Sequence, residues 1–153
     1  MVNQKTLPSI KTMKEVKLLQ CFNEQELQEF IQLGQIVSFE EYSNIIIEGE
    51  LTWGIYFILE GVIGVFKSNK MSSNTYDVGN LKKGSFFGEM SLVDDGARSA
   101  TVRALTQCHL FYISKDGFNS FISKSNDRKT RFYENCVKVI VSLSLIHISE
   151  PTR

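Results

Sequence analysis

Residues Gly84 to Val102, which read GSFFGEMSLVDDGARSATV, decide how the rest of this chain is organised. The stretch has the pattern of a strand end, a glycine entry, one turn of helix, a loop and a new strand. Gly88 allows the main chain to approach a ligand closely and exposes N–H groups at the start of the short helix. The pattern therefore predicts a ligand site at the junction between a strand and this helical turn.

Two charged side chains give the stretch its chemistry. Glu89 lies at the start of the helical turn, where its carboxylate can accept hydrogen bonds from two hydroxyl groups of a sugar. Arg98 follows the turn at residues 94–96 and carries a planar, permanently charged fork that suits a phosphate. Together with an amide nest, these groups meet the needs of a small anionic nucleotide. The alternative is that Glu89 and Arg98 simply pair with each other across a surface loop.

The runs from Phe87 to Leu92 and from Arg98 to Val102 closely resemble the phosphate-binding cassette of cyclic nucleotide-binding domains. This sensor module occurs in the catabolite activator protein, in cAMP-dependent kinase regulatory subunits and in gated channels. The resemblance covers roughly residues 11–145. It implies a regulatory binding module rather than an enzyme, with cAMP as the favoured ligand, cGMP as the alternative, and no further cofactor.

The resemblance also implies a role for individual residues. Glu89 would hold the ribose 2′-hydroxyl, Arg98 would pair with the exocyclic oxygen of the cyclic phosphate, and Ser99 would add a hydroxyl. Two valines would line the purine side. The expected ligand-binding residues are Gly88, Glu89, Met90, Arg98, Ser99, Ala100, Val65 and Val78.

One departure from the resemblance concerns the support of Arg98. Many relatives have a Gly-Asp pair before the third strand, and its acid steadies the arginine. This chain has Thr52-Trp53 at that place, with Glu50 as the candidate substitute. If Glu50 does not hold Arg98 in place of that acid, the resemblance implies that Arg98 is less well held and that the affinity for the nucleotide is lower.

Composition excludes several other classes of protein. The 153 residues suffice for one domain with a core. The 17 basic residues balance the 17 acidic ones, so the chain lacks the basic excess expected of a protein that binds nucleic acid. The three cysteines are far apart without a CxxC motif, so we expect reduced thiols in a cytoplasmic protein. His109 and His147 cannot form a metal cluster. No catalytic motif, signal peptide or membrane span occurs.

The period of the apolar residues predicts a mainly β fold with flanking helices. A helical pattern runs from about Ile10 to Leu33, with a capping box at Asn23 and Glu26 and a stop at Gly34. Between residues 35 and 114 the pattern is that of short strands in a jelly-roll, a double-sheet β-roll. The expected strands are 35–39, 44–47, 54–59, 62–67, 76–81, 98–105 and 108–114.

Helical periodicity returns after Ser114, with a short helix at 115–122 and a longer one from Asp127 to about Ser144. In the family that the chain resembles, this last helix forms a lid over the bound base. Its apolar stripe is equally compatible with core packing or with the seam of a homodimer.

The expected organisation has three parts. Residues 1–10 form a loose tail, and residues 11–145 form the domain, with helices at 11–33, the roll at 35–114 and C-terminal helices at 115–145. Residues 146–153 resemble translated sequencing-adaptor DNA, which leaves open whether they are native and how the natural chain continues beyond Leu143. Two alternative functions therefore stand: a roll that serves interaction or dimerisation without a ligand, and the sensor half of a catabolite activator protein-type transcription factor.

Overall fold

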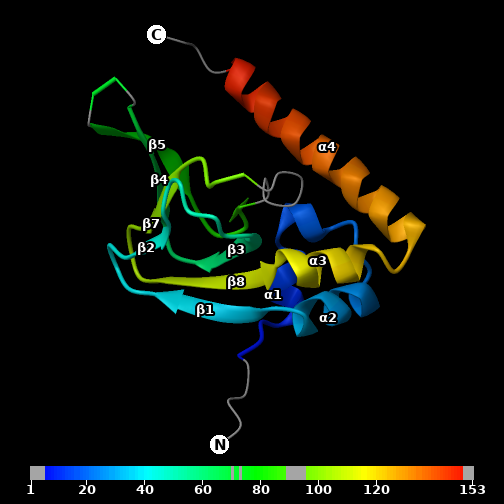
Figure 1. Cartoon of the computed structure of the whole chain (residues 1–153). Coiled ribbons are helices and arrows are strands. Elements are labelled where there is room, and N and C mark those ends of the chain that lie inside the picture. Colours follow the sequence, from blue (N-terminus) through cyan, green and yellow to red (C-terminus); the bar gives the residue numbers. More distant parts are fainter. Residues whose placement is uncertain (1–5, 70, 73, 89–95, 150–153) are drawn as a thin grey trace, which may run out of the picture.

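The computed structural model describes residues 6–69, 71–72, 74–88 and 96–149, and within them eight strands form two antiparallel sheets. The first sheet has the order β1-β8-β3-β6 and the second the order β2-β7-β4-β5. The strands are β1 (Gln35–Phe39), β2 (Asn44–Ile46), β3 (Gly54–Glu60), β4 (Ile63–Ser68), β5 (Thr75–Leu81), β6 (Phe86–Phe87), β7 (Thr101–Ala104) and β8 (Cys108–Ser114). The structure confirms the expected jelly-roll with flanking helices (Figure 1).

Two strand boundaries near the cassette differ from the sequence prediction. β6 is a two-residue strand that pairs with Tyr56 and Phe57 of β3, and it is too short to give a period of its own. β7 begins at Thr101 rather than at Arg98. The main chain of Arg98 bonds instead to the loop before β3, through Glu50 O at 2.9 Å and Gly49 N at 2.9 Å.

The N-terminal helical region is divided into α1 (Ile10–Lys14), a 3₁₀ helix η1 (Lys17–Leu19) and α2 (Glu24–Gln32). The predicted capping box is confirmed, because Asn23 accepts from the N–H of Glu26 while Glu26 accepts from the N–H of Asn23. Gly34 follows α2 for another reason than a left-handed cap. A Cβ there would lie 2.4 Å from the Phe111 ring, so glycine permits the close approach of β8.

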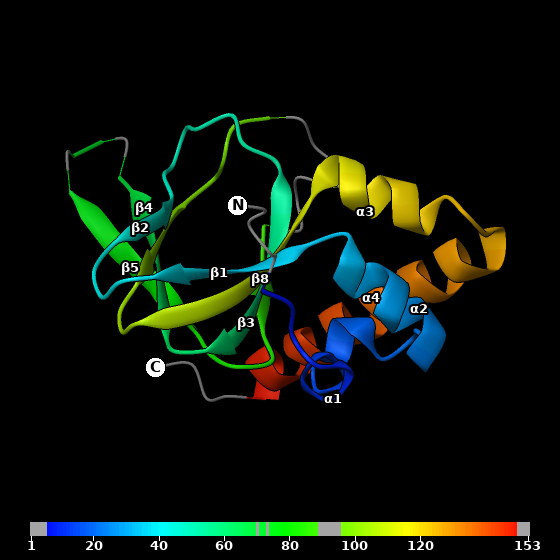
Figure 2. The same cartoon turned by 90° about the horizontal axis from the view of Figure 1, so that it is seen from below.

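The C-terminal helices are α3 (Lys115–Ile122), capped by Ser114, and α4 (Asn126–Ser149). Figure 2 shows the helices grouped at one end of the roll, with the β4–β5 hairpin at the other. An aromatic cluster joins the helices to the roll, since the ring of Phe30 on α2 packs 5.8, 5.6 and 5.2 Å from those of Phe57, Phe111 and Phe121. Burial of such rings stabilises the roll and the helices as one core.

Among the described residues, no helix combines the length and the apolarity that crossing a membrane requires.

Candidate functional site

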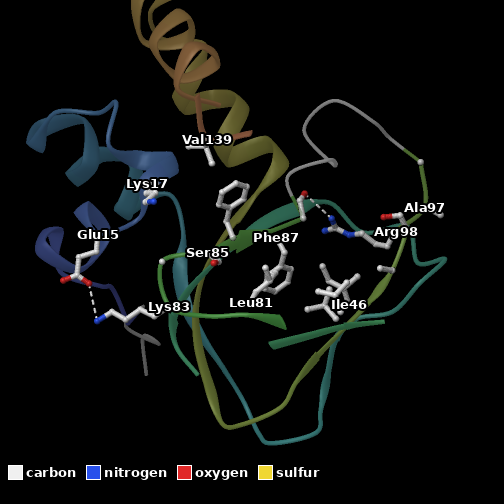
Figure 3. A pocket seen from close by; sticks show the side chains of 18 residues that line it. Glu15, Lys17, Ile46, Leu81, Lys83, Ser85, Phe87, Ala97, Arg98 and Val139 are labelled. Carbon is white, nitrogen blue, oxygen red and sulfur yellow. Dashed lines mark hydrogen bonds and ion pairs between the residues drawn. The ribbon is translucent and has the colours of Figure 1, made fainter. Parts of the chain in front are cut away.

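A cavity of about 690 Å³ lies between the roll, the N-terminal helices and α4. Its size falls in the range of small-molecule sites. Ile46, Val65, Leu81 and Val102 form an apolar wall supplied by β2, β4, β5 and β7. Figure 3 shows Arg98 on one side of this cavity and Glu15, Lys17 and Lys83 on the other.

Three oxygen atoms of described residues accept hydrogen bonds from the side chain of Arg98. Its Nε donates to Thr52 Oγ1 at 3.0 Å, and its two terminal nitrogens donate to Gly88 O at 3.3 Å and to Gly54 O at 3.2 Å. The bond to Gly88 is drawn in Figure 3. These bonds place a permanently charged guanidinium at one end of the apolar wall, where an anion gains most from a cationic partner.

Gly88 allows the strand end to come this close to β3. Its φ is +87°, and a Cβ would lie 2.6 Å from Gly54 O and 3.1 Å from a terminal nitrogen of Arg98. Only glycine meets both the left-handed conformation and the contact. The close approach that this glycine permits is toward Gly54 O, and the approach to a ligand that the sequence predicts stays a prediction.

The structure brings five of the eight expected site residues to this cavity. They are Gly88, Arg98, Ser99, Ala100 and Val65. Glu89 and Met90 lie outside the described residues.

Val78 is the expected residue that the structure does not bring to the cavity. Val65 pairs with Gly79 and Phe66 with Asp77, so Val78 is the extra residue of a β-bulge. Its side chain is 53% exposed. A bulge shifts the alternation of faces along a strand, so Val78, which the resemblance had placed on the purine side, does not share the face of Val65.

Sequence reasoning missed the charged residues on the second side of the cavity, although the resemblance had placed the last helix over the bound base. Lys83, between β5 and β6, forms an ion pair with Glu15 after α1 at 3.3 Å, and Lys17 and Val139 of α4 line the same space. These residues come from three segments that are more than 50 positions apart. No local motif joins them, so no signal in the sequence could have indicated this rim.

A polar network fixes α4 to the N-terminal helices and thereby places Val139. Arg131 donates to Glu26 at 2.7 and 2.9 Å and to Cys21 O at 2.7 Å, and Asn135 donates to Leu18 O at 2.8 Å. Glu26 is only 8% exposed. The guanidinium of Arg131 lowers the pKa of Glu26 to about 2, and the carboxylate in turn raises the pKa of Arg131.

The described residues contain no group of three side chains that could hold a metal ion. Close to Arg98, burial and the neighbouring Tyr112 raise the pKa of Tyr56, and this phenol therefore stays neutral at neutral pH. The charge that the described residues offer to a ligand at this end of the cavity is the guanidinium of Arg98.

Comparison with known proteins begins with the family model of the cyclic nucleotide-binding domain, which matches residues 36–125. Human potassium/sodium hyperpolarization-activated cyclic nucleotide-gated channel 4 is 39% identical over 87 residues, which are 56% of this chain and 7% of the channel. The corresponding channel 1 of Oryctolagus cuniculus is 40% identical over 87 residues, which are 56% of this chain and 9% of that channel. This chain therefore spans a small part of the curated relatives that it matches.

Solved structures share the fold. The catabolite activator protein of Thermus thermophilus superposes with a TM-score of 0.71 at 22% identity, covering 87% of this chain and 63% of that one. The regulatory domain of Toxoplasma gondii PKA, crystallised with cAMP, superposes with a TM-score of 0.72 at 20% identity. The superposition covers 84% of this chain and 48% of the PKA chain.

Proposed function

This chain belongs to the cyclic nucleotide-binding domain family, and from that premise we propose that it is a regulatory, non-catalytic module that binds cAMP. The observation that carries the proposal is the position of Arg98, whose guanidinium is fixed at one end of a cavity of about 690 Å³ with an apolar wall. A cyclic nucleotide has the matching shape, since one phosphate charge is attached to a ribose and a flat, largely apolar base.

Each part of the ligand has a partner of suitable chemistry. The phosphate pairs with Arg98 and with the hydroxyl of Ser99, and the base packs against Val65 and the rest of the apolar wall. Glu89, placed here from the sequence alone, accepts the ribose 2′-hydroxyl. The related channels are named as cyclic nucleotide-gated, and the similar PKA domain was crystallised with cAMP, which supports this class of ligand.

The bound base reports its presence through α4. Val139 of this helix lines the cavity beside residues of the roll, so a ligand that fills the space contacts both (Figure 3). Binding then changes the contacts that hold α4, and the helix passes the signal on. The extent of the shift is limited by the difference in ligand affinity between the two positions of the helix.

Calorimetric titration with cAMP and with cGMP tests the proposal. Arg98→Ala removes the phosphate partner and should weaken binding severely. Arg103→Ala is the matched control, because Arg103 lies on the neighbouring β7 and contacts Asn44 and the Phe66 ring outside the cavity. A native protein that binds neither nucleotide would overturn the proposal in favour of a ligand-free interaction module. If cGMP binds more tightly than cAMP, the preferred ligand is cGMP and the rest of the proposal stands.

A further inference from the structure

Thr52 lies on the surface in the loop before β3, and its hydroxyl accepts an exposed hydrogen bond from Nε of Arg98, whose two terminal nitrogens make part-buried bonds. We propose that Thr52 is a positioning residue, which orients the guanidinium of Arg98 for the ligand phosphate. The inference rests on the proposed function, and it assigns to a neutral hydroxyl the support that the sequence had led us to expect from Glu50.

The geometry explains why this hydroxyl matters. Thr52 holds Nε at 3.0 Å, while the oxygens of Gly54 and Gly88 hold the two terminal nitrogens at 3.2 and 3.3 Å. Three bonds on three nitrogens fix both the plane of the guanidinium and its rotation in that plane. Two of these acceptors are main-chain oxygens, and the Nε bond is the one that depends on the identity of a side chain.

The loop that carries Thr52 is anchored on both sides. Before it, Glu50 O accepts from the N–H of Arg98 at 2.9 Å. After it, the hydroxyl of Tyr112 donates to Trp53 O at 3.0 Å. The hydroxyl of Thr52 is therefore presented from a fixed main chain, as a preorganised binding site requires.

The neutrality of these three acceptors has a consequence for binding. A hydroxyl and two carbonyls orient a guanidinium through partial charges, and none of them brings a full negative charge to the phosphate subsite. Thr52 thus directs the Arg98 fork toward an anion without adding a like charge that would repel that anion.

The experiment uses calorimetry with cAMP on four proteins. Thr52→Val keeps the shape but loses the acceptor, and we expect binding about 3- to 10-fold weaker, the effect of one lost hydrogen bond. Thr52→Ser keeps the hydroxyl and should stay within about 2-fold of the native protein. Thr106→Val is the matched control, because Thr106 is also exposed and its hydroxyl accepts a bond from Val62 N, away from the cavity; its affinity should not change.

Coupling to Arg98 is measured in two ways. In an Arg98→Lys background the side chain has no Nε–H fork, and Thr52→Val should cause no further loss of affinity. Without any ligand, solvent exchange of the Arg98 Nε–H, followed by ¹⁵N NMR, should speed up in Thr52→Val and stay slow in Thr52→Ser.

The outcomes separate this inference from the proposed function. A native protein that binds no cyclic nucleotide overturns the proposed function and, with it, the role in phosphate binding. If the native protein binds cAMP and Thr52→Val binds equally well, the positioning role is wrong while the function stands. Unchanged Nε–H exchange in Thr52→Val, or a full further loss in the Arg98→Lys background, also overturns the role.

Discussion

Gly88 is the residue at which backbone sterics shape the site most directly. Its positive φ and its contact with Gly54 O bring the strand end, the loop before β3 and Arg98 to one point. Gly49 has a similar φ of +89°, but a Cβ built there meets nothing within 4 Å. The two glycines therefore separate the cost of left-handed backbone from the cost of a steric clash.

Substitution of these glycines by alanine gives the first prediction. Gly49→Ala should lower the free energy of unfolding by about 1–2 kcal/mol, the cost of a left-handed conformation for a residue with a Cβ. Gly88→Ala adds a 2.6 Å clash with the main chain, so it should cost more and should also weaken cAMP binding. Urea unfolding and calorimetry measure both effects. Equal losses of stability in the two variants would show that the close approach at Gly88 is unimportant.

At the scale of elements, the docking of α4 on α2 centres on one buried carboxylate, that of Glu26, while Glu29 pairs with Arg128 at 2.9 Å. Arg128 and Arg131 both donate to Glu26, and Arg128 also stacks over the Phe121 ring at 4.4 Å. Because Val139 lies two turns beyond Arg131, this network sets where α4 meets the cavity.

The pH dependence of stability tests this network. The pKa of Glu26 is about 2 in the folded protein and near its ordinary 4.5 when unfolded. Its contribution, on the order of 3 kcal/mol, is therefore fully present above about pH 4.5 and is lost as the pH falls toward 2. Glu26→Gln should lower the unfolding free energy strongly at pH 7 and much less at pH 3.

The control for this experiment is Glu24→Gln in the same helical turn, where the carboxylate is exposed and lies 3.9 Å from Lys14. This variant should change the unfolding free energy little at either pH. If both variants behave alike in chemical unfolding, the network around Glu26 does not stabilise the docked helix.

Ligand-dependent movement of α4 is the second prediction for this element. If the base contacts Val139, cAMP should raise the protection of amides 126–141 in hydrogen exchange. In Arg98→Ala at the same cAMP concentration, chosen below the dissociation constant of that variant, protection should stay at the ligand-free level. A native protein that binds cAMP without any change in this helix would be a passive binder, and the proposed signalling would be wrong.

At the scale of the whole molecule, α4 also presents an apolar stripe to solvent. Tyr133, Val137 and Val141 recur every four residues and are 45%, 60% and 48% exposed. This spacing places them on one face of the helix. The homodimer through the C-terminal helix that the sequence suggested stays a prediction. The sequence had based it on an apolar stripe made of Phe132, Cys136, Val139, Ile140 and Leu143. In the structure Phe132 is buried in the core and Val139 lines the cavity, so the exposed stripe is the surface that would form the dimer.

Light scattering after size-exclusion chromatography tests the dimer. The native protein should show a concentration-dependent mass above 17.4 kDa. Val137→Lys places a charge in the centre of the stripe and should return the monomer mass, because an unpaired buried charge is costly. Lys11→Ala, an exposed change on α1 away from this stripe, should leave the equilibrium as it is. If the native protein is monomeric at all concentrations, the predicted homodimer is wrong.

The sequence by itself determined the features that depend on near neighbours. The capping box at Asn23 and Glu26, the strand periods and the glycine at 88 follow from local hydrogen bonding, from alternation of side chains and from backbone sterics. Each of these acts over a few residues, so its signal is present in the order of the amino acids.

Only the tertiary structure decided the features that depend on segments far apart in the chain. The bulge that turns Val78 outward arises from pairing with β4, and the acceptor for Arg98 proved to be Thr52, 46 residues away. The rim of Lys83 and Val139 closes the cavity from two further segments. The physical reason is the same in each case, since these contacts are set by how the roll closes and where α4 docks, and neither leaves a local pattern.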